Sequence, residues 1–183
     1  MKSIVAAMMM VCVVATNGFG TTYTSPTEYS AGFGDNSAHI AVDFDYGNSF
    51  VFEYHWDGEA SGEDALQVLD AEGSLDVSHS DPYPGWGILI YDFAYPGGTK
   101  FDYGSSANTG WHYYLSDNGS NWESSGVGVS GRTLTNGGWD SWVWTNYDAD
   151  WLPLRQPGEM PVPEPTTLTL LAFGAGMFVR KKA

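Results

Sequence analysis

The sequence predicts an α+β domain that is mainly β, with a mixed or antiparallel sheet and one short helix. Three observations predict it: alternating apolar residues over 38–56, a helical period over 62–71, and short aromatic runs separated by turn residues from 75 to 145. Alternation with a period of two is typical of half-buried strands, and a sheet of this kind is completed by a helix packed on one face.

The first two strands are predicted as a hairpin. Ile40, Val42 and Phe44 alternate with small or polar residues, so we expect regular structure to begin at Ala38. The second run then places aromatic side chains on one face, with Tyr46-Gly47-Asn48 as the turn between the two runs. These aromatic side chains are Phe50, Phe52, Tyr54 and Trp56.

One helix is predicted over 62–71. Ser61 lies three residues before Asp64, which is typical of a helix cap with a carboxylate in the first turn. Leu66 and Leu69 share one helical face and are expected to pack on the sheet.

The rest of the domain is predicted to be β. Gly87 to Phe93 is apolar on both faces, which favours a central, covered strand. Trp111, Tyr113 and Leu115 share one face of a later strand, and Asp117 to Ser120 is expected to form a tight turn. Strands are expected over 75–78, 87–93, 100–103, 111–115, 122–125 and 139–145.

Two glycine-containing motifs are interpreted as structural. Gly126 to Gly131 matches the dinucleotide-binding string, but it neither follows a buried strand nor opens a helix, so we expect a β-connection. Asp117 to Trp122 resembles the Asp-box of bacterial sialidase-type propellers. That resemblance implies a turn in which the Asp accepts backbone N–H groups and the Trp fills the core.

Both ends of the chain read as export signals. Residues 1–20 have a basic start and an apolar run, as in a secretory signal peptide; an uncleaved anchor is the alternative. Residues 161–183 contain Val162, Pro163, Glu164 and Pro165, then an apolar transmembrane run from Thr166 to Val179. The chain ends on a basic cluster that resists transfer across the bilayer, namely Arg180, Lys181 and Lys182.

This tail resembles the PEP-CTERM sorting tag of Gram-negative bacteria, and an ordinary C-terminal anchor is the alternative. The resemblance implies an exported protein with a membrane-anchored intermediate, a sorting protease of the exosortase type as partner, and a final place at the cell surface or outside the cell. Between the two signals we expect a polar leading segment over 21–37, a β-rich domain over 38–150 and a Pro-rich tether over 151–160.

A second, looser resemblance covers roughly 44–147. The order of the expected elements is similar to that in the C-terminal domain of transcobalamin. These elements are a helix, a strand with Gly near its start, an aromatic strand with an Asn-Gly turn, and a Gly–Trp strand. The likeness implies a β-grasp-like arrangement and a role in covering a ligand. No cobalamin-contacting residue can be transferred by position.

Composition limits the chemistry. The single cysteine lies in the signal peptide, so the mature domain has no disulfide. The formal net charge of −15 makes nucleic acid a poor partner. We expect no cofactor; calcium is the one metal we consider, at Asp43 and Asp45 or at the acidic group Asp57, Glu59, Glu63 and Asp64.

No catalytic motif stands out, so we expect a non-enzymatic surface or matrix protein associated with exopolysaccharide. The main alternative is a carbohydrate-binding module, and a small extracellular hydrolase is a further one. The chain holds eight Trp, eleven Tyr and nine Phe, and aromatic rings stack on sugars as well as filling cores. The candidate glycan contacts are Trp86, Tyr91, Trp111, Tyr113, Trp139 and Trp142.

Overall fold

The computed structural model describes residues 23, 25–44, 48–96 and 108–158. The signal peptide, the turn at Tyr46-Gly47, the expected strand at 100–103 and the sorting segment lie outside the described residues.

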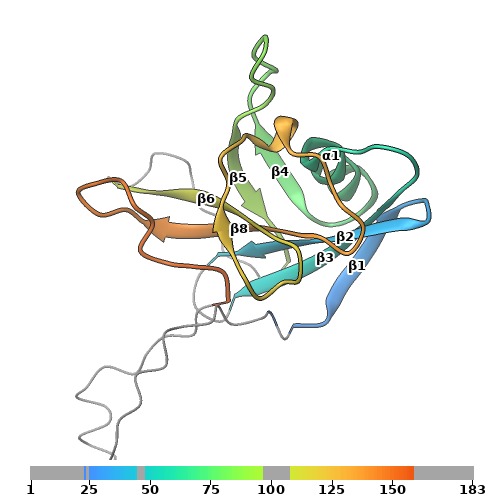
Figure 1. Cartoon of the computed structure of the whole chain (residues 1–183), viewed down its shortest axis with the longest axis horizontal. Helices are drawn as coiled ribbons and strands as arrows, with labels where there is room; N and C mark the ends of the chain where they lie inside the picture. The colour runs from blue at the N-terminus through green and yellow to red at the C-terminus, as the bar shows by residue number, and fades with distance from the viewer. Residues whose placement is uncertain (1–22, 24, 45–47, 97–107, 159–183) are drawn as a thin grey trace, which may run out of the picture.

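A six-stranded mixed sheet runs through the molecule in the order β1-β3-β2-β8-β6-β7 (Figure 1). Its strands are β1 (Thr27–Gly32), β2 (Asn36–Asp43), β3 (Ser49–Trp56), β6 (Thr109–Ser116), β7 (Glu123–Ser124) and β8 (Trp139–Asn146). A second sheet contains β4 (Asp76–His79) and β5 (Ile90–Ala94). This confirms the α+β, mainly β class with one α-helix within the described residues, which also include a short 3-10 helix, η1 (Val129–Gly131).

The predicted hairpin is present as β2 and β3, which pair antiparallel with Ile40 opposite Phe52. The expectation that regular structure begins at Ala38 is wrong, because β1 lies in the leading segment and pairs parallel with β3. Of its sequence, TEYSAG, only Tyr29 and Ala31 pack on the core, and the other four residues are exposed. Two residues are too short a run to predict a strand by alternation, and backbone pairing with β3 completes the strand.

The helix α1 (Gly62–Glu72) covers one face of the large sheet. A capping box fixes its start: Asp64 N–H donates to Ser61 Oγ at 3.1 Å, and Ser61 N–H donates to Asp64 Oδ2 at 2.7 Å. Ala65, Leu66 and Leu69 are buried against the main core, as the helical period predicts.

The strand β5 is not central in the large sheet, contrary to expectation. It pairs with β4 alone among the described strands, and this small sheet lies on the same side as α1 (Figure 1). Phe93 is nevertheless fully buried, because its ring packs at 4.9 Å from Trp111 and 5.5 Å from Trp142 of the large sheet. The apolar residues of β5 are therefore buried because the small sheet packs on the large one, and not because β5 lies between two strands of the large sheet.

The opposite face of the large sheet holds a smaller aromatic cluster. Tyr23, Ala41 and Val51 are buried there, with Trp122 and Trp139 packed against them. The turn before Trp122 is as expected, but the accepting groups differ from the Asp-box: Asn118 Oδ1 accepts from Ser120 and Asn121 N–H, and Ser116 Oγ accepts from Gly119 N–H.

The described part of the expected tether is docked on the domain. Pro153 forms a β-bridge with Tyr147, and Leu154 N–H donates to the Asn146 carbonyl at 2.9 Å. Arg155 is 7% exposed and pairs with Asp43. The folded part of the chain therefore extends at least to Gly158, and the tether prediction is wrong from 151 to 158.

Candidate functional site

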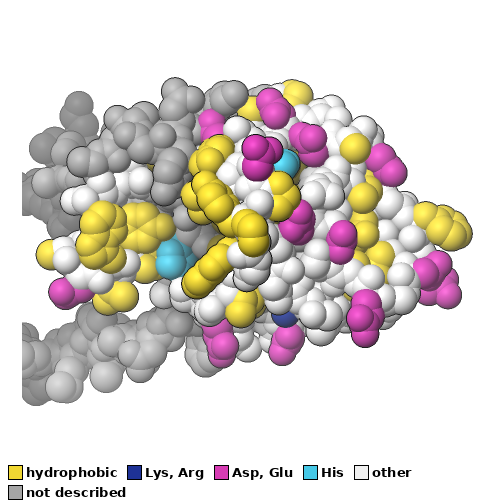
Figure 2. All heavy atoms as spheres, turned by 90° about the horizontal axis from the view of Figure 1, so that it is seen from above, with side chains coloured by type: hydrophobic (Ala, Val, Ile, Leu, Met, Phe, Trp, Pro, Cys, Tyr) yellow, Lys and Arg dark blue, Asp and Glu magenta, His cyan; other side chains and the backbone are white. Residues whose placement is uncertain are grey.

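An aromatic groove crosses one face of the molecule. Two adjoining hollows of about 520 and 600 Å³ meet at Val127 and Gly128. We call their union the aromatic groove; its ring-bearing residues are Tyr83, Trp86, Trp111, Tyr113, Trp142, Tyr147 and Trp151. Figure 2 shows one face of the molecule on which hydrophobic side chains gather near the middle, with acidic side chains beside and below them.

Trp86 stands at one end of the groove and is 84% exposed. The turn that carries it closes through Tyr83 N–H to the Gly87 carbonyl at 2.8 Å and Gly87 N–H to the Tyr83 carbonyl at 3.0 Å. Ile88 N–H donates to Ser130 Oγ at 3.0 Å, which attaches this turn to the Gly126–Gly131 segment. These hydrogen bonds fix the turn, and the turn presents the Trp86 indole to solvent.

Trp151 stands at the other end and is 69% exposed. Its φ of 61° is left-handed, which costs a residue with a side chain about 1–2 kcal/mol. Asp148 Oδ1 holds this turn by accepting from Asp150 and Leu152 N–H, both at 2.9 Å. Asn108, also left-handed with φ 59°, lies beside it and accepts from Tyr147 N–H at 2.8 Å. Backbone strain collected in this way often marks a functional position.

The floor of the groove is rigid. Tyr113 and Trp142 are stacked with their centroids 4.4 Å apart. Beneath them the Tyr113 hydroxyl donates to the Asp140 carboxylate, which also accepts from Arg132 Nε at 3.2 Å. Burial raises the pKa of Asp140, with Tyr113 and Arg132 acting in the opposite direction. The same burial, and the nearby Asp140 charge, raise the pKa of the Tyr113 hydroxyl. The network is buried, so we interpret it as support for the floor.

The structure brings together four of the six aromatic residues considered from sequence. Trp86, Trp111, Tyr113 and Trp142 line the groove, although Tyr113 and Trp142 are buried in its floor. Trp139 lies on the opposite face, stacked 4.2 Å from His39, and half-buried Tyr91 lies on β5 outside the lining. Three further groove residues were not predicted from the sequence, namely Tyr83, Tyr147 and Trp151. The only sequence signal that could have indicated them is their position in or beside turn-rich segments.

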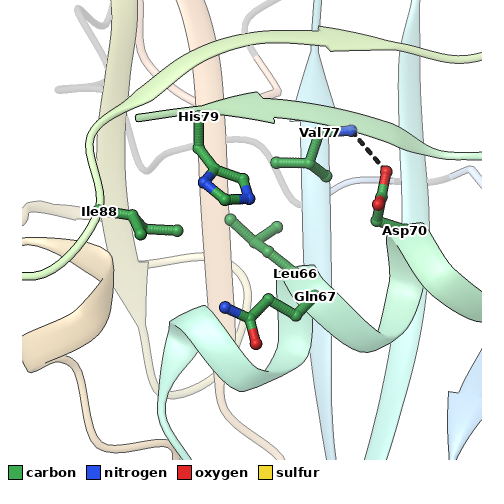
Figure 3. Close-up of a pocket in the computed structure, with 6 residues that line it drawn as sticks. All are labelled: Leu66, Gln67, Asp70, Val77, His79 and Ile88. Atoms are coloured by element: carbon green, nitrogen blue, oxygen red, sulfur yellow. Dashed lines mark hydrogen bonds between the residues drawn. The ribbon is translucent and has the colours of Figure 1, made fainter. Parts of the chain in front are cut away.

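A smaller hollow of about 230 Å³ lies between α1 and β4. Figure 3 shows the His79 ring turned toward Leu66 and Gln67, while Asp70 accepts from Val77 N–H at 2.9 Å. His79 Nδ1 donates to the Ser80 carbonyl at 2.8 Å. This hollow has no aromatic platform and less room, so the aromatic groove is the stronger candidate site.

Several of the carboxylates considered for calcium have local partners. Asp43 pairs with Arg155, Asp64 caps α1, and Asp57 accepts from Asp35 N–H at 3.0 Å; Asp45 lies outside the described residues. Across the described ranges, no group of three or more His, Cys, Asp or Glu side chains is placed to hold a metal ion.

Comparison with known proteins identifies the end of the chain. The family described as the PEP-CTERM protein-sorting motif matches residues 161–182. The chain carries a PEP-CTERM sorting motif. No curated protein and no solved structure matches the chain, so the likeness to transcobalamin-like domains stays an expectation.

The PEP-CTERM motif implies export, a membrane-associated intermediate and processing by an exosortase. The residues matched include the whole Val162–Pro165 motif, Arg180, Lys181 and Lys182. Among residues 23, 25–44, 48–96 and 108–158, no helix is long and apolar enough to cross a bilayer.

Proposed function

We propose that this PEP-CTERM protein is a non-enzymatic binding protein that associates with exopolysaccharide at the cell surface or in the matrix. The aromatic groove is its binding site. The observation that carries the proposal is the pair of exposed indoles, Trp86 and Trp151, held at the two ends of one groove by bonded turns.

The composition of the groove suits sugars. Sugar rings have an apolar face that stacks on aromatic rings, and polar edges that hydrogen-bond to amides, hydroxyls and backbone groups. The lining supplies both kinds of partner, with Asn108, Thr109 and Ser130 among the tryptophans and glycines. A ligand bound at one indole can continue along the groove toward the other.

The lining favours binding over hydrolysis. The described residues that line the groove carry no Asp, Glu, His, Lys or Arg. Acid–base hydrolysis of a glycosidic bond uses two carboxylates that face the scissile bond. The groove as described offers stacking and hydrogen bonding instead.

The test is glycan-array and calorimetric binding of the full chain, kept in mild detergent because of its apolar tail. Trp86→Ala and Trp151→Ala are each expected to weaken binding at least about tenfold. Phe33→Ala is the matched control, because Phe33 is 88% exposed but lies outside the groove. Equal loss in all three variants, or binding of an apolar dye but of no saccharide, would refute the proposal.

A further inference from the structure

Among the described residues, no Lys or Arg side chain is unpaired. Arg132 and Arg155 are the basic residues of the described ranges. Each pairs with a buried aspartate, Arg132 with Asp140 at 3.2 Å and Arg155 with Asp43 at 2.7 Å. The positive charges are therefore cancelled inside the domain, and the potential outside is set by the exposed carboxylates.

Exposed carboxylates lie close in the chain to both exposed tryptophans of the groove. Asp81 lies two residues before the turn that begins at Tyr83 and carries Trp86, and Asp150 directly precedes Trp151. Glu63 also lies at the Trp86 end, since a Cβ built on Gly87 would be 3.6 Å from its Oε2. The groove lining thus carries no charged side chain, while carboxylates lie close to both of its exposed tryptophans; Figure 2 shows acidic side chains beside hydrophobic ones on one face of the molecule.

This combination selects a ligand by charge. A uronate, sulfate or phosphate group would be repelled by these carboxylates, and no described guanidinium or ammonium group is available to pair with it. A protonated amino group gains from the same carboxylates and from the faces of the tryptophan rings, which attract cations.

We infer that the ligand of the aromatic groove is a polysaccharide bearing free, protonated amino groups. The inference rests on the proposed function, because it concerns the same groove and names the class of glycan that occupies it. The carboxylates close to Trp86 and Trp151 attract the ammonium groups, and the rings of these two residues stack on the sugar faces.

The test compares oligomers of equal length made of glucosamine, N-acetylglucosamine and galacturonic acid. The full chain in mild non-ionic detergent is titrated with each at about pH 5.5, where the glucosamine amines are protonated. At about 0.01 M salt the glucosamine oligomer is expected to bind more tightly than the acetylated one, by up to about fivefold for each amine near one of these carboxylates. At about 1 M salt the difference should be largely lost, and the galacturonate oligomer should bind least at low salt.

Two double variants locate the effect. Asp81→Asn with Asp150→Asn should reduce the preference for glucosamine. Asp35→Asn with Asp76→Asn removes the same charge from two exposed positions that are not close in the chain to Trp86 or Trp151, and should reduce the preference less. Glucosamine binding should also weaken in Trp86→Ala.

The outcomes separate the two proposals. If the acetylated oligomer binds in a Trp86-dependent way and glucosamine is no tighter, the charge inference is overturned and the proposed function stands. The inference is likewise overturned if galacturonate binds best. If no oligomer binds, the charge inference is overturned, and the proposed function fails as well if no saccharide of the glycan array binds. If Trp86→Ala changes none of the affinities, both proposals fail.

Discussion

The Arg155 guanidinium donates to the Asp43 carboxylate at 2.7 Å and joins the last described segment to β2, 112 residues earlier in the chain. Arg155 also donates from Nη1 to the Trp144 carbonyl at 2.6 Å, and its N–H donates to Thr145 Oγ1 at 2.9 Å. The Gly158 backbone is within hydrogen-bonding reach of the Asp43 and Tyr23 side chains and acts to lower the pKa of each. Both ends of the described domain therefore meet at one buried ion pair.

Breaking this pair from one side should destabilise the domain. Arg155→Met leaves Asp43 buried without its counter-charge, and we expect a loss of about 3–5 kcal/mol in the free energy of unfolding. The double variant Asp43→Val with Arg155→Met should recover most of it, because no uncompensated charge remains. Urea unfolding followed by tryptophan fluorescence measures both; a double variant no better than the single one would contradict the argument.

Trp151 offers a test of strain held at the groove. Trp151→Ala removes the ring but keeps a Cβ in the left-handed conformation, whereas Trp151→Gly also relieves the conformation. We expect both variants to lose glycan binding, and the Gly variant to be more stable than the Ala variant by roughly 1 kcal/mol. Thermal unfolding paired with binding measurements checks this; equal stabilities would show that the backbone is not strained there.

Gly87 and Gly85 form a matched pair in the Trp86 turn. Both have positive φ, 76° and 79°, but a Cβ on Gly87 would lie 1.9 Å from Ser130 Oγ, whereas one on Gly85 meets nothing within 4 Å. Gly85→Ala should cost about 1–2 kcal/mol from conformation alone. Gly87→Ala should cost a further 1–3 kcal/mol, roughly, and weaken glycan binding, because Ser130 must move and release Ile88. Adding Ser130→Gly to Gly87→Ala should restore part of the stability, and a failure to do so would place the clash elsewhere.

His112 gives a pH dependence of known sign. Its Nε2 bonds to Ser124 Oγ at 2.6 Å and its Nδ1 to the Tyr147 hydroxyl at 3.3 Å, and burial lowers its pKa. The unfolded chain then binds the proton more readily than the folded one, so this contribution is present above about pH 6.5 and is lost as pH falls through the folded-state pKa.

The measurement is the free energy of unfolding of wild type and His112→Gln between about pH 8 and 5. Wild type should lose stability relative to the variant on acidification. Asp43 and Asp140, whose pKa values are raised by burial, contribute with the opposite sign but equally in both proteins. A difference that is constant with pH would contradict the role given to His112.

The sorting motif predicts a defined loss of the tail. In cells with an active exosortase the mature protein should lack the tail from Val162 onward, as read from intact masses of envelope and medium fractions. Replacing Arg180, Lys181 and Lys182 with Ala, or Pro163 and Pro165 with Ala, should leave the full-length chain uncut. Lys100→Ala is the control for removing a basic residue outside the tail, and normal processing of the triple variant would contradict the prediction.

Local patterns in the sequence were sufficient for most of the fold. The hairpin of β2 and β3, the helix starting at Gly62 and the face shared by Trp111 and Tyr113 all follow from periods of two or 3.6 residues. The strand β1 could not be found this way, because its residues mostly face solvent and its partner, β3, follows it only after β2. The placement of β5 failed because an apolar run does not say whether neighbouring strands or another layer will cover it.

The sequence by itself determined the sorting motif and the alternation that places apolar side chains on one face of strands such as β2, β3 and β6, whereas the signal peptide, and with it the removal of the single cysteine, stays a prediction. Only the tertiary structure decided which rings remain exposed, why Trp86 and Trp151 share one groove while Trp139 packs on the opposite face, and that Arg155 pairs with Asp43. The physical reason is the separation along the chain of the residues that interact. Periodicity and signal motifs act between residues close in the chain, whereas a groove and a buried ion pair exist only after segments far apart have packed together.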